Sequence, residues 1–292
     1  MFTDWYAVRK HWHGYGALKH LVIFGASYCD VGYTPASPHP SKDRPLGVDF
    51  PGRTYSEPGT PNWVGHFVRD LSPNPAEPLL AYTYAVGGHD VSGVVRQVEE
   101  LFVPDVGRKP EWAPWKASDT LFITCIGLSD CARAAFAQST HEETVMRLMA
   151  SQARLYEIGA RNFLIIDAPP MHRLEISPFG PDLAPTLASS FHTWNTHLHA
   201  SLHKFSSTHP SATTLLFSSW AFWNSVYDNP ETFGFTPADV QERGGKVWLS
   251  NLLITSRMHA VFAEEMVGFL NNVPAFEGDP KKKHLNTSPG AS

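Results

Sequence analysis

The 292-residue chain lacks the apolar runs that would take it into or across a membrane. No stretch reaches the ~18 consecutive apolar residues that a membrane-spanning helix needs, and residues 1–20 contain no apolar core of signal-peptide length. Cysteine is scarce as well, because Cys29, Cys125 and Cys131 are too few for a disulfide framework and suit a reducing compartment. We therefore expect an intracellular, cytoplasmic protein.

The chain has no long run of charge of one sign. The net charge of -5, with both signs interspersed, leaves no basic stripe for nucleic acid and no polybasic anchor for an anionic membrane. Gly87-Gly88 lacks the flanking pattern of a nucleotide-binding loop, and His199 and His203 share a helix face without a third ligand nearby. We expect no metal, no cofactor and a small-molecule partner.

No break in composition divides the chain. With 42% apolar residues, it can bury a large core. We expect one domain over residues 1–276 and a flexible tail over residues 277–292, because that tail is first charged and then small and polar.

Short apolar runs alternate with segments of helical periodicity. Strands that are covered on both faces are continuously apolar, so these runs predict a buried parallel sheet of five strands, and the alternation predicts an α/β fold with helices on both faces. The predicted strands are residues 20–25, 80–86, 120–126, 162–167 and 213–217, and the predicted helices are residues 61–70, 91–103, 142–158, 187–205 and 255–270. In such sheets ligands bind at the carboxyl ends of the strands, where Ser27, Gly88 and Asp130 fall.

The first predicted strand breaks at Gly25 and presents Ser27 at the turn, which is how a nucleophile is displayed. This stretch resembles the first sequence block of the SGNH or GDSL hydrolases, with Ala26 in place of an aspartate. From about Leu21 to about Leu270 the chain resembles the fungal acetylesterases of carbohydrate esterase family sixteen. The motifs that carry this resemblance lie at residues 62–67, 84–88, 126–130, 159–163, 168–170 and 228–230.

The resemblance implies a three-layer α/β/α sandwich, the SGNH hydrolase fold, with Ser27 as the nucleophile and Gly88 as an oxyanion donor. It also shows what is missing. The family's Asp-x-x-His pair is replaced by Ser250 and Leu253, which can neither orient nor perform proton transfer, and the family's oxyanion asparagine is Ser129. His259, six residues after Leu253, we interpret as a structural residue of the last helix.

Three titratable residues near the expected pocket are candidates for replacement acid–base chemistry. In order, they are His89, beside the oxyanion glycine, then Asp130 and Asp30. Each also has a structural alternative. His89 would lie at the start of a helix that Asp90 caps, and Asp130 and Asp30 would hydrogen-bond the loops around them. Tyr28 and other aromatic residues near the expected mouth favour an apolar ligand.

Three functions remain open from the sequence. The first is a non-hydrolytic cyclase, isomerase or lyase (a dehydratase) of fungal secondary metabolism, since orientation alone lowers a barrier by ~7–11 kcal/mol. The second is a slow esterase, such as an acetylesterase, or an acyltransferase with Ser27 as nucleophile. The third is a small-molecule binding protein without catalysis. We expect the first, because both partners of the serine are lost.

Overall fold

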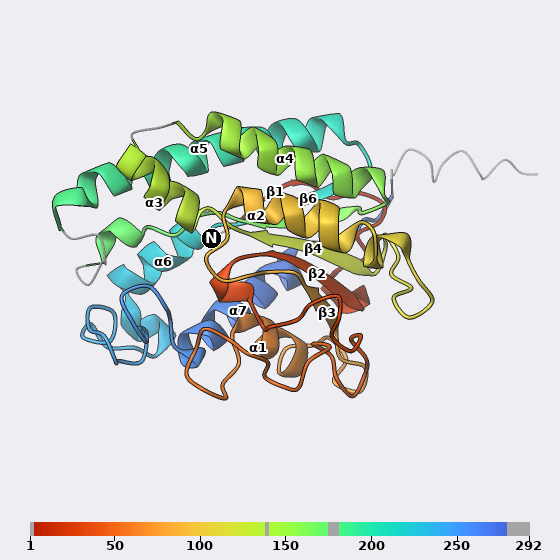
Figure 1. Cartoon of the computed structure of the whole chain (residues 1–292), viewed down its shortest axis with the longest axis horizontal. Coiled ribbons are helices and arrows are strands. Elements are labelled where there is room, and N and C mark those ends of the chain that lie inside the picture. The colour runs from red at the N-terminus through yellow and green to blue at the C-terminus, as the bar shows by residue number, and fades with distance from the viewer. Residues whose placement is uncertain (1–2, 138–139, 175–180, 279–292) are drawn as a thin grey trace, which may run out of the picture.

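The computed structural model describes residues 3–137, 140–174 and 181–278 of the chain (Figure 1). Almost all of the expected tail, residues 279–292, lies outside the described residues. Among the helices that are described, none has both the length and the apolar character needed to cross a membrane.

The centre of the molecule is one six-stranded sheet with the strand order β1-β6-β5-β4-β2-β3. Five of its strands are parallel, as predicted, and their side chains are buried almost throughout, which explains their continuous apolar sequence. These strands are β2 (His20–Gly25), β3 (Leu80–Thr83), β4 (Thr120–Cys125), β5 (Asn162–Ile166) and β6 (Thr213–Phe217).

The sixth strand was not predicted. This strand, β1 (Thr3–Ala7), pairs antiparallel with β6 at the edge of the sheet, with Thr3 opposite Phe217. An edge strand is covered less completely than a central one, so its five residues include polar side chains and lack the continuous apolar run by which the other strands were identified.

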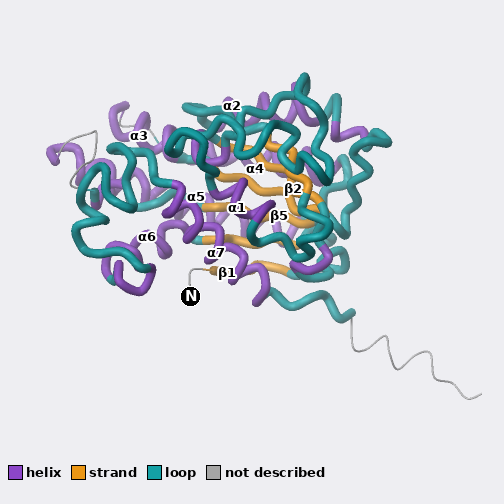
Figure 2. Tube along the Cα trace, turned by 90° about the horizontal axis from the view of Figure 1, so that it is seen from below, coloured by secondary structure: helices purple, strands orange, loops and turns teal. Residues whose placement is uncertain are grey.

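Helices cover both faces of the sheet and give the three layers that were expected (Figure 1). One face carries α2 (Val91–Arg96), α3 (Leu128–Ala137), α4 (Glu142–Glu157) and α5 (Ala184–Thr208). The other carries α1 (Trp63–Arg69) and α7 (Ser256–Asn272), which pack on each other, and Figure 2 shows the strands behind them. The remaining helix, α6 (Ser219–Asp228), follows β6.

Two of these helices were not predicted from the sequence. In α6, serine and aromatic residues, which have modest helix propensity, hide the helical pattern. The N-terminus of α6 is nevertheless well capped, because the Ser218 side chain accepts from the Ala221 N–H. The other, α3, is only 10 residues long and begins one residue after Gly127, whose φ of +123° makes the turn out of β4.

The histidine of α7 is a core residue, as the sequence analysis expected. The His259 side chain is 1% exposed, and its ring meets the Tyr28 ring edge-on at a centroid distance of 5.6 Å. Burial lowers the pKa of His259 from 6.5 to about 3, and the nearby His66 adds to this effect. The folded protein therefore holds His259 neutral.

We expect His259 to make the protein less stable in acid. The unfolded chain binds a proton at His259 below pH 6.5 and the folded chain does not until about pH 3, so stability is lost as the pH falls through this window. Between pH 7 and pH 5 the loss from this one group is about 2 kcal/mol. Urea unfolding of wild type and His259→Leu at both pH values measures it.

The variant is expected to lose less unfolding free energy on acidification than wild type does. The same substitution at the exposed His192 serves as the matched control and leaves the acid dependence as it is in wild type. An equal acid dependence in wild type and His259→Leu would contradict the burial of a neutral imidazole.

Candidate active site

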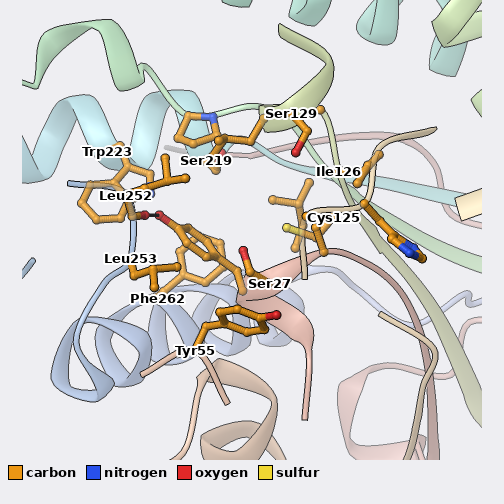
Figure 3. Close-up of a pocket in the computed structure, with 18 of the residues that line it drawn as sticks. Ser27, Tyr55, Cys125, Ile126, Ser129, Ser219, Trp223, Leu252, Leu253 and Phe262 are labelled. Atoms are coloured by element: carbon orange, nitrogen blue, oxygen red, sulfur yellow. Dashed lines mark hydrogen bonds between the residues drawn. The ribbon is translucent and has the colours of Figure 1, made fainter. Parts of the chain in front are cut away.

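A cavity of about 400 Å³ lies at the carboxyl ends of the parallel strands (Figure 3). The residues that directly follow β2, β4 and β5 line it, and these are Ala26, Ile126 and Asp167. The loop before α7 adds Ser250, Leu252 and Leu253. The other lining residues are mostly apolar or small and include Tyr28, Tyr55, Cys125, Leu128, Ile166, Trp223 and Phe262.

Ser27 lines this cavity at the start of a single 3-10 turn, Ser27–Cys29, that follows β2. No side chain among the described residues hydrogen-bonds its hydroxyl. Figure 3 shows the Leu253 side chain directed toward Ser27, with Phe262 on the same side of the cavity. Leucine has no lone pair to accept the serine proton, so the position where the resemblance implies a base is apolar.

Ser250, at the position where the resemblance implies an aspartate, organises the loop that carries Leu253. Its hydroxyl accepts hydrogen bonds from the Leu252 and Leu253 N–H groups at 3.3 and 3.1 Å. The Tyr28 hydroxyl donates to the Leu252 carbonyl at 2.6 Å and ties this loop to the Ser27 turn. Both positions at which the resemblance implies the catalytic pair thus line the cavity, and the side chains there, a serine and a leucine, carry neither a charge nor a general base.

Gly88 also lines the cavity and presents a backbone N–H with no partner among the described residues. Its φ is +79°, a conformation that favours glycine, whereas an added Cβ would meet no atom within 4 Å. The backbone conformation, rather than crowding, is thus the reason for glycine here. Ser129, in the first turn of α3, lies on the opposite wall from Tyr55, with Ser27 between them in Figure 3.

His89 lines the cavity, but its hydrogen bonds disfavour the role of a base. The buried Gln97 amide accepts from the Gly25 N–H and donates to the Gly25 carbonyl, both at 2.9 Å, which fixes the orientation of the amide. The amide NH₂ therefore also points at His89 Nδ1, 3.0 Å away, and Nδ1 must accept. Because Nδ1 accepts, the ring carries its proton on Nε2, and burial, then the charge of Arg96, lowers the pKa of His89 in the same direction.

The two carboxylates proposed with His89 do not line the cavity. Asp30 is buried and accepts from the Gly32 N–H at 2.8 Å and the Gly87 N–H at 2.9 Å, so it joins the loop after Ser27 to the loop of Gly88. Asp130 accepts from the Val91 N–H at 3.2 Å, at the start of α2. Burial raises the pKa of Asp130 to about 6. Of Ser27, Gly88 and Asp130, expected to share one pocket, only the first two line it.

The sequence analysis missed three polar residues of the cavity wall, Asp167, Ser219 and Tyr55. The Ser219 hydroxyl donates to the Asp167 carbonyl. Asp167 follows β5, but its carboxylate is already occupied by the Ser218 hydroxyl at 2.8 Å, the Trp220 N–H at 2.9 Å and His199 at 3.2 Å. Tyr55 comes from the proline-rich loop before α1, which carries no periodic signal. No group of three or more metal-binding side chains gathers anywhere in the described parts of the chain.

Comparisons with known proteins agree with this geometry, although no protein-family model matches the chain. An acetylesterase of Thermothelomyces thermophilus is 28% identical, over 80% of this chain and 82% of its own length. Among solved structures, a catalytic mutant of the acetylxylan esterase Axe2 of Geobacillus stearothermophilus superposes with a TM-score of 0.54 at 12% identity, covering 86% of this chain and 94% of that one.

A second solved structure, the α/β hydrolase LAE5 from the metagenome of Lake Arreo, has a TM-score of 0.52 at 13% identity, over 91% of this chain and 99% of that one. Catalytic mutants of Axe2 carry alanine in place of a serine, an aspartate or a histidine. At sequence identities of 12–13%, these structures show a shared fold and nothing about activity. The chain thus has the SGNH hydrolase fold and is a sequence relative of an acetylesterase.

Proposed function

We propose that this chain binds carboxylic esters in the cavity at Ser27 and is an ester hydrolase or acyltransferase with Ser27 as its nucleophile. One observation carries the proposal. Ser27 and Gly88 line the same cavity, and neither the Ser27 hydroxyl nor the Gly88 N–H has a hydrogen-bond partner among the described residues. Acyl transfer through a serine needs these two groups, a nucleophile and a donor for the developing oxyanion. The acetylesterase and acetylxylan esterase relatives support the same chemistry.

The reaction would proceed in two steps. The Ser27 oxygen forms a bond to the acyl carbon, the bond from that carbon to the alcohol oxygen breaks, and the alcohol leaves with a proton. Water or a second alcohol then takes the acyl group from Ser27 and returns a proton to it. No described side chain accepts the Ser27 proton in the first step, so it passes to water or to the leaving alcohol. Loss of triad members costs ~10⁴–10⁶ in related enzymes, and we expect a slow reaction.

The sequence analysis ranked a non-hydrolytic reaction before ester chemistry, and we now rank ester chemistry first. The lost Asp-x-x-His pair led us to expect cyclisation, isomerisation or dehydration, but the related proteins favour ester chemistry and nothing favours those reactions. Of the three acid–base candidates, Asp30 and Asp130 do not line the cavity, and His89 Nδ1 already accepts a hydrogen bond. Ester chemistry at Ser27 therefore takes first place.

The size of the cavity bears on the choice of ester. A volume of about 400 Å³ far exceeds what an acetyl group fills, and the wall near Ser27 is built from Leu253, Phe262, Trp223 and Leu252. Such a wall stabilises an apolar acyl or alcohol group by removing it from water. We propose esters with an apolar portion larger than acetyl as the substrate class.

We expect hydrolysis of p-nitrophenyl acetate to be slow and to depend on Ser27. Ser27→Ala should remove the enzymatic part of the rate, whereas Ser250→Asp combined with Leu253→His should raise it by on the order of 10² or more, because a general base contributes about 10²–10⁴. Steady-state release of p-nitrophenol measures both effects.

The matched control is Ser250→Asn combined with Leu253→Gln, which makes the same two positions polar without forming a relay. It is expected to show no gain over wild type, because neither side chain can act as a general base, and a gain equal to that of the Asp and His pair would contradict the relay as its cause. A Ser27→Ala variant that keeps the wild-type rate would show that Ser27 is not the nucleophile.

We also expect the rate to rise with the length of the acyl chain. Burial of each methylene is worth about 0.8 kcal/mol, so kcat/KM should increase about fourfold per methylene from acetate until the cavity is filled. Competition assays with p-nitrophenyl acetate, butyrate, hexanoate and octanoate give this series. A preference for acetate over all longer esters would contradict the proposed substrate class.

A further inference from the structure

Tyr55 brings a phenolic hydroxyl to the cavity from a loop that is separate in sequence from both Ser27 and Gly88. It lies in the long loop between the Ser27 turn and α1, lines the cavity, and is 40% exposed. Its hydroxyl has no hydrogen-bond partner among the described residues. Exposed tyrosine hydroxyls are common, so its importance depends on what lies next to it.

The Tyr55 ring packs against the loop that carries the oxyanion glycine. A Cβ placed on Gly87 would collide with the hydroxyl and ring carbons of Tyr55, so the absence of a side chain at Gly87 is what lets the phenol lie there. The next residue is Gly88, whose N–H is unpaired within the described residues. The phenolic hydroxyl therefore lies against the residue that precedes the proposed oxyanion donor.

Hydrogen bonds hold the loops of Tyr55, Gly88 and Ser27 together. The Gly87 N–H donates to Asp30 at 2.9 Å, and Asp30 is three residues after Ser27. The Asn62 side chain donates to the Asp30 carbonyl at 2.9 Å, which joins the start of α1 to the same turn. In Figure 3 the Tyr55 ring lies below Ser27, whereas Ser129 lies above it across the cavity.

An oxyanion that forms next to Ser27 needs more than one donor. Gly88 supplies one N–H, but Ser129 replaces the asparagine that the resemblance implies and belongs to the opposite wall. A tyrosine hydroxyl is a neutral donor that keeps its proton while it hydrogen-bonds an oxyanion. We propose that Tyr55 is a catalytic residue that donates a hydrogen bond, together with the Gly88 N–H, to the carbonyl oxygen of an ester bound at Ser27. This role rests on the proposed function.

The test measures the reaction of Ser27 with a fluorophosphonate, a single-turnover reaction that builds negative charge on the phosphoryl oxygen and needs no efficient deacylation. Intact-mass spectrometry follows the adduct over time in wild type, Tyr55→Phe, Ser27→Ala and the control Tyr156→Phe, which alters a phenol on α4 next to Arg161. Tyr55→Phe keeps the ring over Gly87 and removes only the hydroxyl.

We expect labelling of wild type at Ser27, the same rate in Tyr156→Phe, no adduct in Ser27→Ala, and labelling slower by on the order of 10² in Tyr55→Phe, as for the loss of one oxyanion donor. Gly87→Ala should slow labelling as well, because its Cβ displaces the phenol. With p-nitrophenyl hexanoate, Tyr55→Phe should lower kcat and leave KM nearly unchanged.

The outcomes separate this inference from the proposed function. Labelling of Tyr55→Phe at the wild-type rate, with Ser27→Ala unlabelled, overturns the role of Tyr55 and leaves Ser27 as the nucleophile. A Tyr55→Phe variant that changes only KM overturns the role as well, because the hydroxyl then contributes to substrate binding alone. A wild-type protein that takes up no label at Ser27 overturns the proposed nucleophile and the donor together.

Discussion

Hydrogen bonds between the Gln97 side chain and the Gly25 backbone fix the end of β2, from which the chain turns to Ser27. The amide pairs with the buried Gly25 N–H, which would cost about 1–3 kcal/mol if left unpaired, and shares the Gly25 carbonyl with the Val86 N–H. Gly25 carries no side chain because the Cys125 backbone and the Cys29 sulfur occupy the space where a Cβ would lie. The same amide donates to His89 Nδ1 and so places the His89 proton on Nε2. One side chain, Gln97, therefore holds the strand end before Ser27 and also sets the tautomer of His89.

Around that turn the cavity wall contains Ser27 and Gly88, which the proposed ester chemistry needs, and no described side chain hydrogen-bonds the Ser27 hydroxyl. Leu253 and Ser250 stand where the family resemblance implies a base and its partner, and Phe262 and Trp223 add apolar surface to the same cavity. An apolar wall lowers the local dielectric, and this strengthens hydrogen bonds to a developing oxyanion while making an isolated charge more costly. An apolar wall of this kind therefore suits the proposed binding of a carbonyl better than it suits the charged intermediate of a proton relay.

The sequence predicted those features that depend on continuous stretches of chain. The five parallel strands were found because burial on both faces leaves an apolar run, and Ser27 and Gly88 were placed in one pocket because they follow strand ends. The edge strand β1 and the helix α6 have no such pattern. The hydrogen bonds of Asp30, Asp130 and His89 could not be predicted either, because their partners come from other parts of the chain or depend on the exact geometry of a helix. Tyr55 was missed because the apolar residues of its loop have no regular spacing from which its place in the fold could be predicted.

The distribution of titratable groups is the reason why we propose nucleophilic chemistry rather than acid–base chemistry in this cavity. His89 is neutral with Nδ1 occupied by Gln97, Asp167 accepts three hydrogen bonds, and Asp130, although its pKa is raised to about 6, accepts from the start of α2 outside the cavity wall. None of them is an available base. Ser27 and the Gly88 N–H, in contrast, line the cavity without partners among the described residues. A reaction that needs a nucleophile and hydrogen-bond donors, and can release its proton to water, is therefore the one that these residues support.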